Sequence, residues 1–315
     1  MKIMNEYKIE KLNSTNLKDL LPIYENAFGY QVPIDFLLKK QDTSTFGLSF
    51  VGFIAYDNFN NPVGFYGVYP CYVLHQNKRY LVAQSGDTMT HNEHTGKGLF
   101  TKLALATYDF CKENGIHLVF GFPNKNSYPG FIKRLGWIHF DNMIPYLIRV
   151  KCIPWLRLKN TFKFPQSLHD RWCNFILSSQ TRGAPFQSSC LTDETPIVDH
   201  SIDFFKYKTY GENHLIQLNG INIWVKFDDT FLLIGDFERC DENTFLTTIR
   251  SLKKLAFKMG LPHLRFQTSS GTWGERLFKK HGIPMEVKYP VGGINFTNVI
   301  PLEKMKFTGA DNDTF

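Results

Sequence analysis

The sequence predicts a mixed α/β protein, in which a central mixed sheet flanked by helices is followed by a second α/β domain. Aromatic and β-branched runs separated by turn residues are typical of an antiparallel meander at the start of the chain. A polar glycine loop, an amphipathic helix and a short apolar strand then follow one another, which indicates a β-α-β crossover. A similar order of elements returns in the second half, and 315 residues are enough for two domains.

The meander contains one helix and four predicted strands. The apolar residues of the helix share one face, and Gly29 can end it. The turn residues of DNFNNP join two strands as a hairpin, and a second short turn lies around Gln76 and Asn77. The expected ranges are 3–10, 49–56, 63–70 and 79–90 for the strands and 17–29 for the helix.

The crossover begins with an amphipathic helix. Apolar residues at helical spacing run from Leu99 to Phe110, and Gly115 ends the pattern. An apolar segment of the kind found in buried parallel strands comes next. We expect a helix over 98–115, a strand over 116–123, a short helix over 126–137 and a strand over 138–150.

The second half repeats this order. Gly86-Asp87 at one predicted strand end matches Gly235-Asp236 at another, and KENGIHLVF and FIKRLG match FKMGLPHLRF and LFKKHG. We interpret this as an internal duplication in which only the first copy kept its glycine loop; chance similarity between two α/β units is the alternative. The expected organisation is a first domain at 1–150, a linker with a helix at 151–189, a second domain at 190–305 and a flexible tail at 306–315.

Composition limits the classes of function. The formal charge of +7 and the pI of about 8.9 suit a polyanionic small ligand, and no concentrated basic stripe predicts nucleic-acid binding. The six cysteines are scattered without metal-ligand spacing, so we expect reduced thiols and no metal site. No long apolar run predicts a membrane span, and we expect a cytoplasmic protein. Residues 151–185 are basic and aromatic; a linker is the simple interpretation, and contact with an anionic membrane is the alternative.

The glycine loop before residue 99 carries the clearest chemical signal. A helix N-terminus presents unpaired N–H groups and about half a positive charge. Gly96 and Gly98 let the backbone approach a bulky anion, and Lys97 adds a cation. The segment therefore predicts a cradle for a pyrophosphate, whereas the spacing required by Walker-type and Rossmann loops is absent.

At this loop the chain resembles the GNAT acetyltransferases. TGKGLF is similar to motif A, with Thr95 in the Gln/Arg place, Gly98 in the invariant glycine place and Phe100 in the Gly/Ala place. A bulky residue in this last place of motif A resembles the loop of the enhanced-intracellular-survival branch of the family. NKNSYPGFIKRLGW is similar to motif B, with Asn124 on its asparagine and Ser127 on its alanine. The resemblance covers residues 1–150, and the second half resembles a degenerate second GNAT-like domain.

The resemblance implies that acetyl-CoA binds between the strands at 79–90 and 116–123. The backbone of Thr88, Met89 and Thr90 would pair with the pantetheine arm, and the loop amides would hold the pyrophosphate. A backbone amide near Met89 would stabilise the oxyanion. The cofactor-binding residues implied are Thr88, Met89, Thr90, Thr95, Gly96, Lys97, Gly98, Leu99, Phe100, Asn124 and Asn126.

Proton transfer needs a general base and a general acid. Asp87 is the first candidate for the general base, with a structural carboxylate as the alternative; His91 and Glu93 can act instead through a water. The motif-B tyrosine, which is the family's general acid, aligns with Ile132, which cannot donate a proton. Tyr128, one helical turn earlier, is the candidate replacement; the chain's C-terminal carboxylate and solvent are the alternatives.

The function that follows is an acetyl-CoA-dependent N-acetyltransferase acting on a small amine, for which an amino sugar and another small cationic amine are both candidates. The acceptor pocket is expected from residues 17–35, the turn at 70–79 and the second half. The alternatives are a Fem-type aminoacyl or peptidyl transferase and a non-catalytic CoA-binding module. The residues expected to line the pocket are Tyr24, Glu25, Tyr30, Tyr69 and Tyr72.

Overall fold

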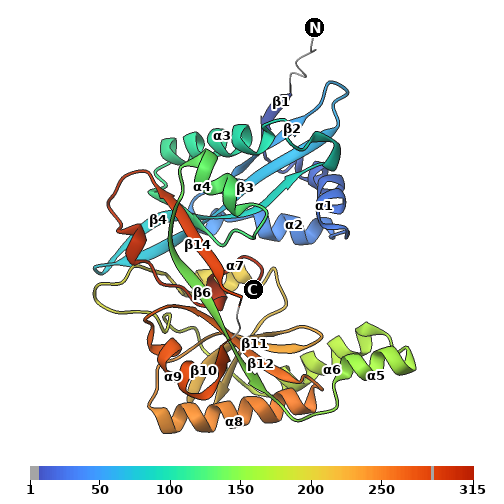
Figure 1. Cartoon of the computed structure of the whole chain (residues 1–315), viewed down its shortest axis with the longest axis vertical. Coiled ribbons are helices and arrows are strands. Elements are labelled where there is room, and N and C mark those ends of the chain that lie inside the picture. Colours follow the sequence, from blue (N-terminus) through green and yellow to red (C-terminus); the bar gives the residue numbers. More distant parts are fainter. Residues whose placement is uncertain (1–6, 285–286) are drawn as a thin grey trace. The chain divides into compact units, whose positions relative to one another are not determined.

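The computed structural model describes residues 7–284 and 287–315, which form two compact units (Figure 1). Unit 1 comprises Met1–Phe140 and Pro290–Lys304, and unit 2 comprises Asp141–Tyr289 and Met305–Phe315. This division differs from the expected boundary at residue 150, because the strand predicted at 138–150 passes from one unit to the other. The chain also returns late to unit 1, which no local sequence pattern indicates.

Unit 1 is built on a mixed sheet with the strand order β1-β2-β3-β4-β5-β14. The first four strands pair antiparallel as the predicted meander, β4 and β5 are parallel, and β14 returns antiparallel to β5. The strands are β1 (Lys8–Lys11), β2 (Gly52–Tyr56), β3 (Pro62–His75), β4 (Lys78–Thr90), β5 (Leu118–Gly121) and β14 (Tyr289–Asn295).

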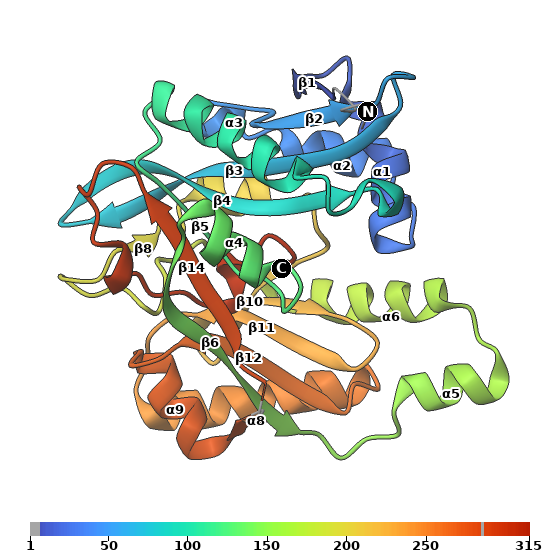
Figure 2. The same cartoon turned by 45° about the horizontal axis from the view of Figure 1, so that its top comes forward.

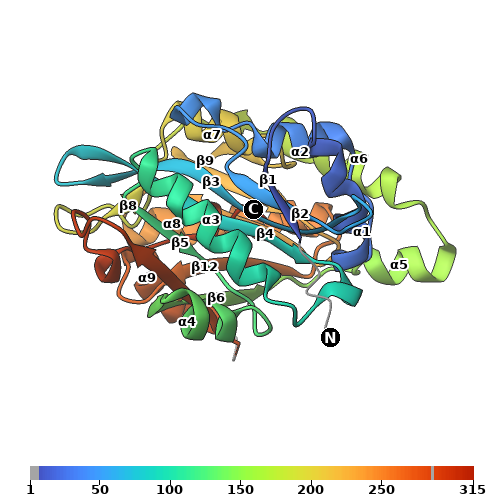
Figure 3. The same cartoon turned by 90° about the horizontal axis from the view of Figure 1, so that it is seen from above.

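Helices cover both faces of this sheet (Figure 2). The core residues of α1 and α2 pack with Ile54 and Phe65, whereas those of α3 and α4 pack with their strand neighbours Ala55 and Tyr66 on the opposite face. Figure 3 shows α3 lying across the strands of unit 1. The helices are α1 (Leu20–Phe28), α2 (Ile34–Gln41), α3 (Leu99–Glu113) and α4 (Tyr128–Leu135).

The strands of unit 2 follow the order β6-β12-β11-β10-β9-β7, in which β11 and β12 are parallel and the other neighbours are antiparallel. Helices α6, α8 and α9 pack on its core, and α7 places Phe205 against Trp224 with the ring centroids 4.2 Å apart. Its strands are β6 (Ile138–Arg149), β7 (Thr181–Arg182), β8 (Ile197–Val198), β9 (His214–Leu218), β10 (Ile221–Phe227), β11 (Phe231–Phe237), β12 (His263–Ser269) and β13 (Ile283–Pro284), and its helices are α5 (Trp155–Phe162), α6 (Gln166–Ser178), α7 (Ile202–Lys208), α8 (Glu242–Lys258) and α9 (Trp273–His281).

The two units share one order of elements. In unit 1, β2, β3 and β4 are antiparallel neighbours, and α3 connects β4 to the parallel strand β5. In unit 2, β9, β10 and β11 are antiparallel neighbours, and α8 connects β11 to the parallel strand β12. A short helix, α4 or α9, follows the parallel strand in each unit. This common topology fits the predicted duplication, which remains a prediction.

The C-terminal segment is a buried part of unit 2, so the prediction of a flexible tail at 306–315 is wrong. Thr308 forms a β-bridge with Thr268 of β12, and the amide of Ser269 donates to the carbonyl of Phe307 at 2.9 Å. A Cβ on Gly309 would lie 3.4 Å from the carbonyl oxygen of Ile234 on β11. The segment therefore lies where β11 and β12 part, and its apolar residues are buried.

None of the helices in the described part of the chain is long and apolar enough to cross a membrane.

Candidate active site

The parallel strands β4 and β5 part soon after they meet. They pair only at Ala83 with Val119 and at Gln84 with Phe120, although β4 continues to Thr90. A β-bulge accentuates the separation, because Phe65 pairs with Met89 while Gly67 pairs with Gly86, so that two residues of β4 oppose one of β3. The edge of β4 over residues 88–90 consequently has main-chain groups that do not pair with β5. This is the edge at which the sequence places the pantetheine arm.

The predicted anion loop follows directly on β4. Gly96 and Gly98 have φ angles of 74° and 81°, the left-handed region that glycine adopts without strain. Nothing lies within 4 Å of a Cβ built on either residue, so the backbone is approachable from solvent. Gly98 occupies the N-cap of α3 and offers no side-chain oxygen to the first turn. The helix N-terminus therefore keeps its N–H groups for another acceptor.

The corresponding helix of unit 2 is capped by its own chain. Asp241 accepts from the amides of Asn243 at 2.9 Å and Thr244 at 3.0 Å. A carboxylate at this position neutralises the helix terminus and uses the N–H groups that an anion would need. Of the two equivalent helices, α3 alone begins at an uncapped glycine.

Phe100 fills space between α3 and α4 and does not face the loop. Its ring lies edge-on to Phe131 with the centroids 5.1 Å apart, and it also contacts Tyr66 at 6.2 Å. A Cβ on Gly130 would meet the Phe100 ring at 2.9 Å. The bulky residue in the Gly/Ala place of the motif is therefore accommodated by a glycine in α4, and it leaves the loop backbone accessible.

The segment after β5 holds the predicted motif-B residues. The side-chain oxygen of Asn124 accepts from the amides of Asn126 at 2.9 Å and Ser127 at 3.0 Å, which fixes the turn before α4. Asn126 is exposed. Tyr128 begins α4, and its ring packs edge-on against His139 at 5.7 Å. Ile132 packs against the core of unit 1 and offers no polar group.

Asp87 is buried in an ion pair. Its Oδ1 lies 2.8 Å from the Lys40 ammonium, and its Oδ2 accepts a hydrogen bond from the Tyr69 hydroxyl. The side chains of Lys40 and Asp87 are only 5% and 7% exposed. Both carboxylate oxygens are thus engaged, which favours the structural alternative over a free general base.

Sequence reasoning missed Lys40, although a signal was present. Lys40 follows Leu37 by three residues, so it falls on the buried face of α2. A lysine on an apolar helix face needs an anionic partner when it is buried. The helix itself was not predicted, and the partner lies 47 positions away in the chain.

A buried polar network lies beneath the point where β4 and β5 part. The Tyr66 hydroxyl is 2.9 Å from the Ser85 hydroxyl and 3.0 Å from that of Tyr108, which accepts from the Trp137 indole at 2.7 Å. Burial raises the pKa of both tyrosines, so they remain neutral. A Cβ added to Gly121, the last residue of β5, would lie only 3.1 Å from the Trp137 ring. The Trp137 ring of the network therefore packs directly against the end of β5.

The described residues also include one cluster able to hold a cation, at the start of the loop. Ligating atoms of His91, Glu93 and His94 lie within 4.8 Å of one another. Nδ1 of His94 is 2.9 Å from the Tyr7 hydroxyl. Partial burial and the nearby charges of Lys97 and His91 lower the pKa of His94, which favours the neutral imidazole. The sequence had suggested His91 and Glu93 for proton transfer and no metal site.

The expected acceptor residues are only partly accessible. Tyr24 belongs to the core beneath α1, and Tyr69 is engaged with Asp87. Tyr30 is 55% exposed, and Glu25 bonds the side chain of Gln31 at 3.0 Å. Tyr24 and Tyr69 therefore have structural roles that the sequence did not indicate.

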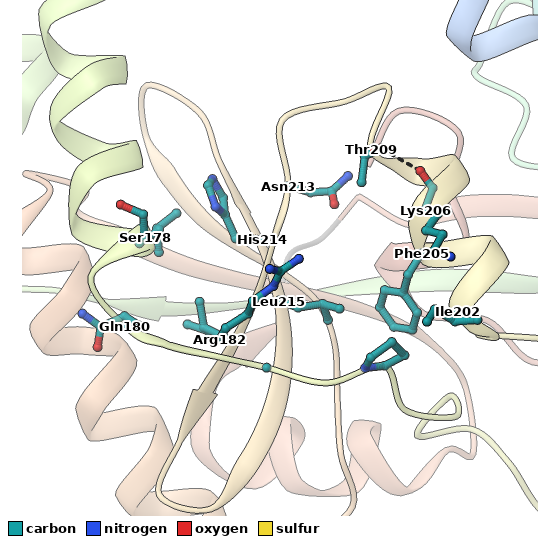
Figure 4. Close-up of a pocket in the computed structure, with 14 residues that line it drawn as sticks. Ser178, Gln180, Arg182, Ile202, Phe205, Lys206, Thr209, Asn213, His214 and Leu215 are labelled. Carbon is teal, nitrogen blue, oxygen red and sulfur yellow. Dashed lines mark hydrogen bonds between the residues drawn. The ribbon is translucent and has the colours of Figure 1, made fainter.

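Unit 2 contains a cavity of about 490 Å³ between the end of α6, β9 and α7 (Figure 4). Ser178, Gln180 and His214 lie on one side of it, while Lys206 and Thr209 of the α7 region lie on the other. Apolar side chains of Leu177, Phe205, Leu215 and Ile216 also line it. None of the residues predicted from the sequence to bind a cofactor lines this cavity.

Comparison with known proteins identifies the class to which the fold of unit 1 belongs. Residues 8–140 match the family described as an acetyltransferase (GNAT) domain, which is less than half of the chain. A search of curated proteins finds no match. The match falls on the meander, the glycine loop and the motif-B segment, so the GNAT fold predicted from the sequence is confirmed for this part.

Solved structures extend the likeness in fold over nearly the whole chain. A GCN5-related N-acetyltransferase from Kribbella flavida superposes with a TM-score of 0.59 at 11% identity, covering 94% of this chain and 73% of that one. N-myristoyltransferase of Saccharomyces cerevisiae with bound myristoyl-CoA gives 0.57 at 11% identity, covering 94% and 84%. A glucosamine N-acetyltransferase region of a fungal GH3 β-N-acetylglucosaminidase gives 0.55 at 13% identity, covering 92% and 38%. At these identities the likeness establishes fold, not activity.

Proposed function

We propose that this protein transfers an acyl group from an acyl-CoA, acetyl-CoA in the simplest case, to the amine of a small molecule. The observation that carries the proposal is the uncapped, glycine-led N-terminus of α3 at the end of the strand that parts from β5. Such a terminus suits the diphosphate of CoA, and the adjacent edge of β4 suits the amide-containing pantetheine arm. The match of residues 8–140 to the GNAT domain supports the same activity.

In this proposal the backbone provides most of the binding. The amides of Gly96–Phe100 hold the diphosphate, Lys97 adds a charge, and Thr95 closes the preceding turn through its hydroxyl bond to the Asn92 carbonyl at 2.9 Å. Thr88, Met89 and Thr90 pair with pantetheine. From the opposite strand end, Asn124 and Asn126 reach the same arm.

The reaction requires a neutral amine, an oxyanion donor and a proton for the leaving group. The amine nitrogen attacks the thioester carbonyl, a C–N bond forms, the C–S bond breaks, and the proton lost by nitrogen balances the proton gained by sulfur. The Met89 amide is the candidate oxyanion donor. The Tyr128 hydroxyl, which has no hydrogen-bond partner among the described residues, is the candidate donor to sulfur. Asp87 positions the β4 bulge through Lys40 and Tyr69.

An amino sugar is the acceptor class that we favour. The fungal neighbour is described as a glucosamine N-acetyltransferase, which makes this class the natural first choice. A panel of amino sugars, polyamines and amino acids, assayed for release of free CoA thiol, tests this choice.

Calorimetry with a pair of matched glycine variants tests the CoA site. Gly98 and Gly115 both have positive φ angles, 81° and 75°, and at both positions an added Cβ would meet open space. Alanine costs similar backbone strain at either position, about 1 kcal/mol. We expect Gly98→Ala to weaken CoA binding by about tenfold or more, whereas Gly115→Ala at the other end of α3 leaves it unchanged. Equal binding by both variants and the native chain would refute the loop as the diphosphate site.

A non-catalytic CoA-binding module is the second candidate. It is favoured by Ile132 in place of the motif-B tyrosine and by the engaged carboxylate of Asp87. CoA binding without thiol release on the whole amine panel would support this candidate over the enzyme. A Fem-type transferase predicts binding of aminoacyl-tRNA and not of CoA, and no feature of the described residues favours it.

A further inference from the structure

Helix α5 has no buried residue, although its sequence WLRLKNTF is rich in apolar side chains. Isolated helices of this length are marginal in water, and most gain their stability by packing an apolar face. Figures 1 and 2 show α5 at the periphery of unit 2, away from its sheet. A helix of this kind is expected to have a partner outside its own unit.

Large apolar side chains are also exposed along α6 and along the loop that joins it to α5. Phe162 and Phe175 are each 63% exposed, and Trp172 is 51% exposed with its indole N–H fixed on the carbonyl of Lys258 at 3.0 Å. Monomeric proteins rarely expose so many apolar groups in one patch. The apolar face consists of Ile153, Leu156, Phe162, Phe164, Leu168, Trp172, Phe175 and Phe257.

A cavity of about 500 Å³ opens within this apolar face. Its walls come from the start of α5, from α6 and from the end of α8, and they include Trp155, Phe164 and Leu168. Trp155 stacks on His169 with the ring centroids 4.6 Å apart, and His169 is bonded to the Met259 carbonyl at 2.8 Å. The His169 Nε2 and the Trp172 indole N–H are thus bonded to main-chain carbonyls, whereas the Trp155 indole N–H and the His169 Nδ1 are buried without a hydrogen-bond partner among the described residues. The remaining lining suits a hydrocarbon chain.

The chain segment that carries most of the apolar face is basic, and its exposed cations are here called the basic rim. Over residues 151–171 the chain carries five Lys or Arg residues, with Asp170 as the only acidic residue. Lys159 is paired with Asp229 at 3.4 Å, whereas the other four cations are exposed. Aromatic residues surrounded by cations are typical of surfaces that bind anionic lipid. The four exposed cations are Lys151, Arg157, Lys163 and Arg171.

We propose that the apolar face of α5 and α6, with its basic rim, docks on an anionic phospholipid membrane and takes a lipid hydrocarbon chain into the 500 Å³ cavity. A second copy of the chain is a poorer occupant, because face-to-face association would place the cations of one rim against those of the other. Docking at the surface requires no spanning helix and buries the apolar side chains of α5. The proposal does not depend on the acyl transfer proposed above.

Vesicle co-sedimentation of the full chain tests the proposal. Vesicles of phosphatidylcholine alone and of phosphatidylcholine mixed with phosphatidylglycerol serve as probes. We expect binding to the anionic vesicles, weakening as salt is raised, with a blue shift of tryptophan fluorescence. Lack of binding to anionic vesicles, or equal binding to both kinds, would overturn the proposal.

Matched variants locate the contact. Phe162→Ser and Phe175→Ser should each lower vesicle partitioning by about tenfold or more, while Phe59→Ser, at an 86% exposed site of unit 1, should have no effect. All three side chains are exposed, and thermal unfolding checks that each variant is folded. Arg157→Gln with Lys163→Gln should reduce binding and its salt dependence, and Lys133→Gln on α4 serves as the charge control. Should sedimentation velocity reveal a dimer that Phe175→Ser dissociates, the face is an interface between copies and the lipid proposal is wrong.

Discussion

Asp87 and Lys40 define the environment of the β4 bulge. A bulge turns one extra residue out of the ladder, and here that residue directs a carboxylate into the protein, where it meets an ammonium and a phenol. The equivalent carboxylate of unit 2, Asp236, is also buried and lies 3.5 Å from His200. Because both Gly-Asp pairs place a carboxylate beside a cationic group, an anchoring role explains both.

Removal of Lys40 tests this role. Lys40→Met leaves Asp87 as an uncompensated buried charge, which should lower the free energy of unfolding by about 3–5 kcal/mol. Adding Asp87→Asn removes that charge. The double variant should therefore lose less unfolding free energy than the sum of the losses of the two single variants. Urea unfolding of the native chain, the two single variants and the double variant measures the coupling energy between Lys40 and Asp87. Additive losses would contradict the anchoring role, and an Asp87→Asn variant of full stability that loses only its rate of acyl transfer would instead identify Asp87 as a base.

Tyr128 can be compared with a second tyrosine in the same setting. Tyr128 packs edge-on to His139 at 5.7 Å and 84°, and Tyr80 packs edge-on to His117 at 5.6 Å and 82°. If Tyr128 protonates the leaving thiolate, Tyr128→Phe should lower kcat by about a hundredfold with little change in KM. Tyr80→Phe is the control and should behave as the native enzyme. A kcat of Tyr128→Phe within about twofold of the control would exclude the acid role.

At the scale of elements, the C-terminal segment completes unit 2. It bridges to β12 through Thr308, and Asp311 reaches His200 with an Oδ1–Nε2 distance of 2.8 Å. Both groups of this pair are almost fully buried. The segment takes the place where β11 and β12 part.

The stability of unit 2 should depend on pH through His200. Burial alone would lower the pKa of His200, but the charges of Asp311 and Asp236 outweigh it and raise that pKa above its ordinary value of 6.5. A raised histidine pKa contributes stability that is complete below 6.5 and is lost as the pH rises through the folded value. Burial also raises the pKa of Asp236, which acts in the same direction.

Measurement of unfolding free energy against pH checks this expectation. The native chain should lose stability as the pH increases above 6.5. His200→Gln should be less stable than the native chain at about pH 6, but its unfolding free energy should change less as the pH rises. A stability of the native chain that is constant or rises there would contradict the assigned direction.

Local pattern predicted the elements with strong periodicity. The strands β2 and β4, the helix α3 and its stop, and the strand β5 lie close to their expected ranges, whereas β3 continues to His75, beyond its expected end at residue 70. The positive φ angles of Gly96 and Gly98 were implied by their place before a helix. Helix α2 was missed because only Leu37 of its apolar residues is fully buried, so its stripe is weak.

Contacts between distant parts of the chain were beyond the reach of local pattern. The pairing of Lys40 with Asp87, the return of β14 to β5 and the insertion of Thr308 beside β12 all join segments far apart in sequence. Residues 306–315 were expected to be a flexible tail. Their burial depends on a gap in a sheet that composition does not reveal.

At the scale of the whole molecule, two units of like topology differ in what remains available for a ligand. In unit 1 the helix after the third meander strand begins at Gly98 without a cap, and β4 leaves β5 after two paired positions, Ala83 and Gln84. In unit 2 the equivalent helix is capped by Asp241, and the parted strands hold residues 307–309. In the proposed duplication, one copy keeps the proposed ligand site and the other uses the equivalent position for its own stability.

This difference predicts that one molecule of CoA binds per chain. Calorimetric titration of the full chain should saturate at a stoichiometry of one, and Gly98→Ala should weaken all of the binding. Asp241→Gly uncaps α8 at a cost of a few tenths of a kcal/mol, yet it should leave the stoichiometry at one, because the C-terminal segment still fills the place where β11 and β12 part. A second CoA bound by Asp241→Gly alone would show that uncapping of the helix, and not the gap beside it, decides which unit binds the cosubstrate, and a second CoA bound by the native chain would contradict both explanations.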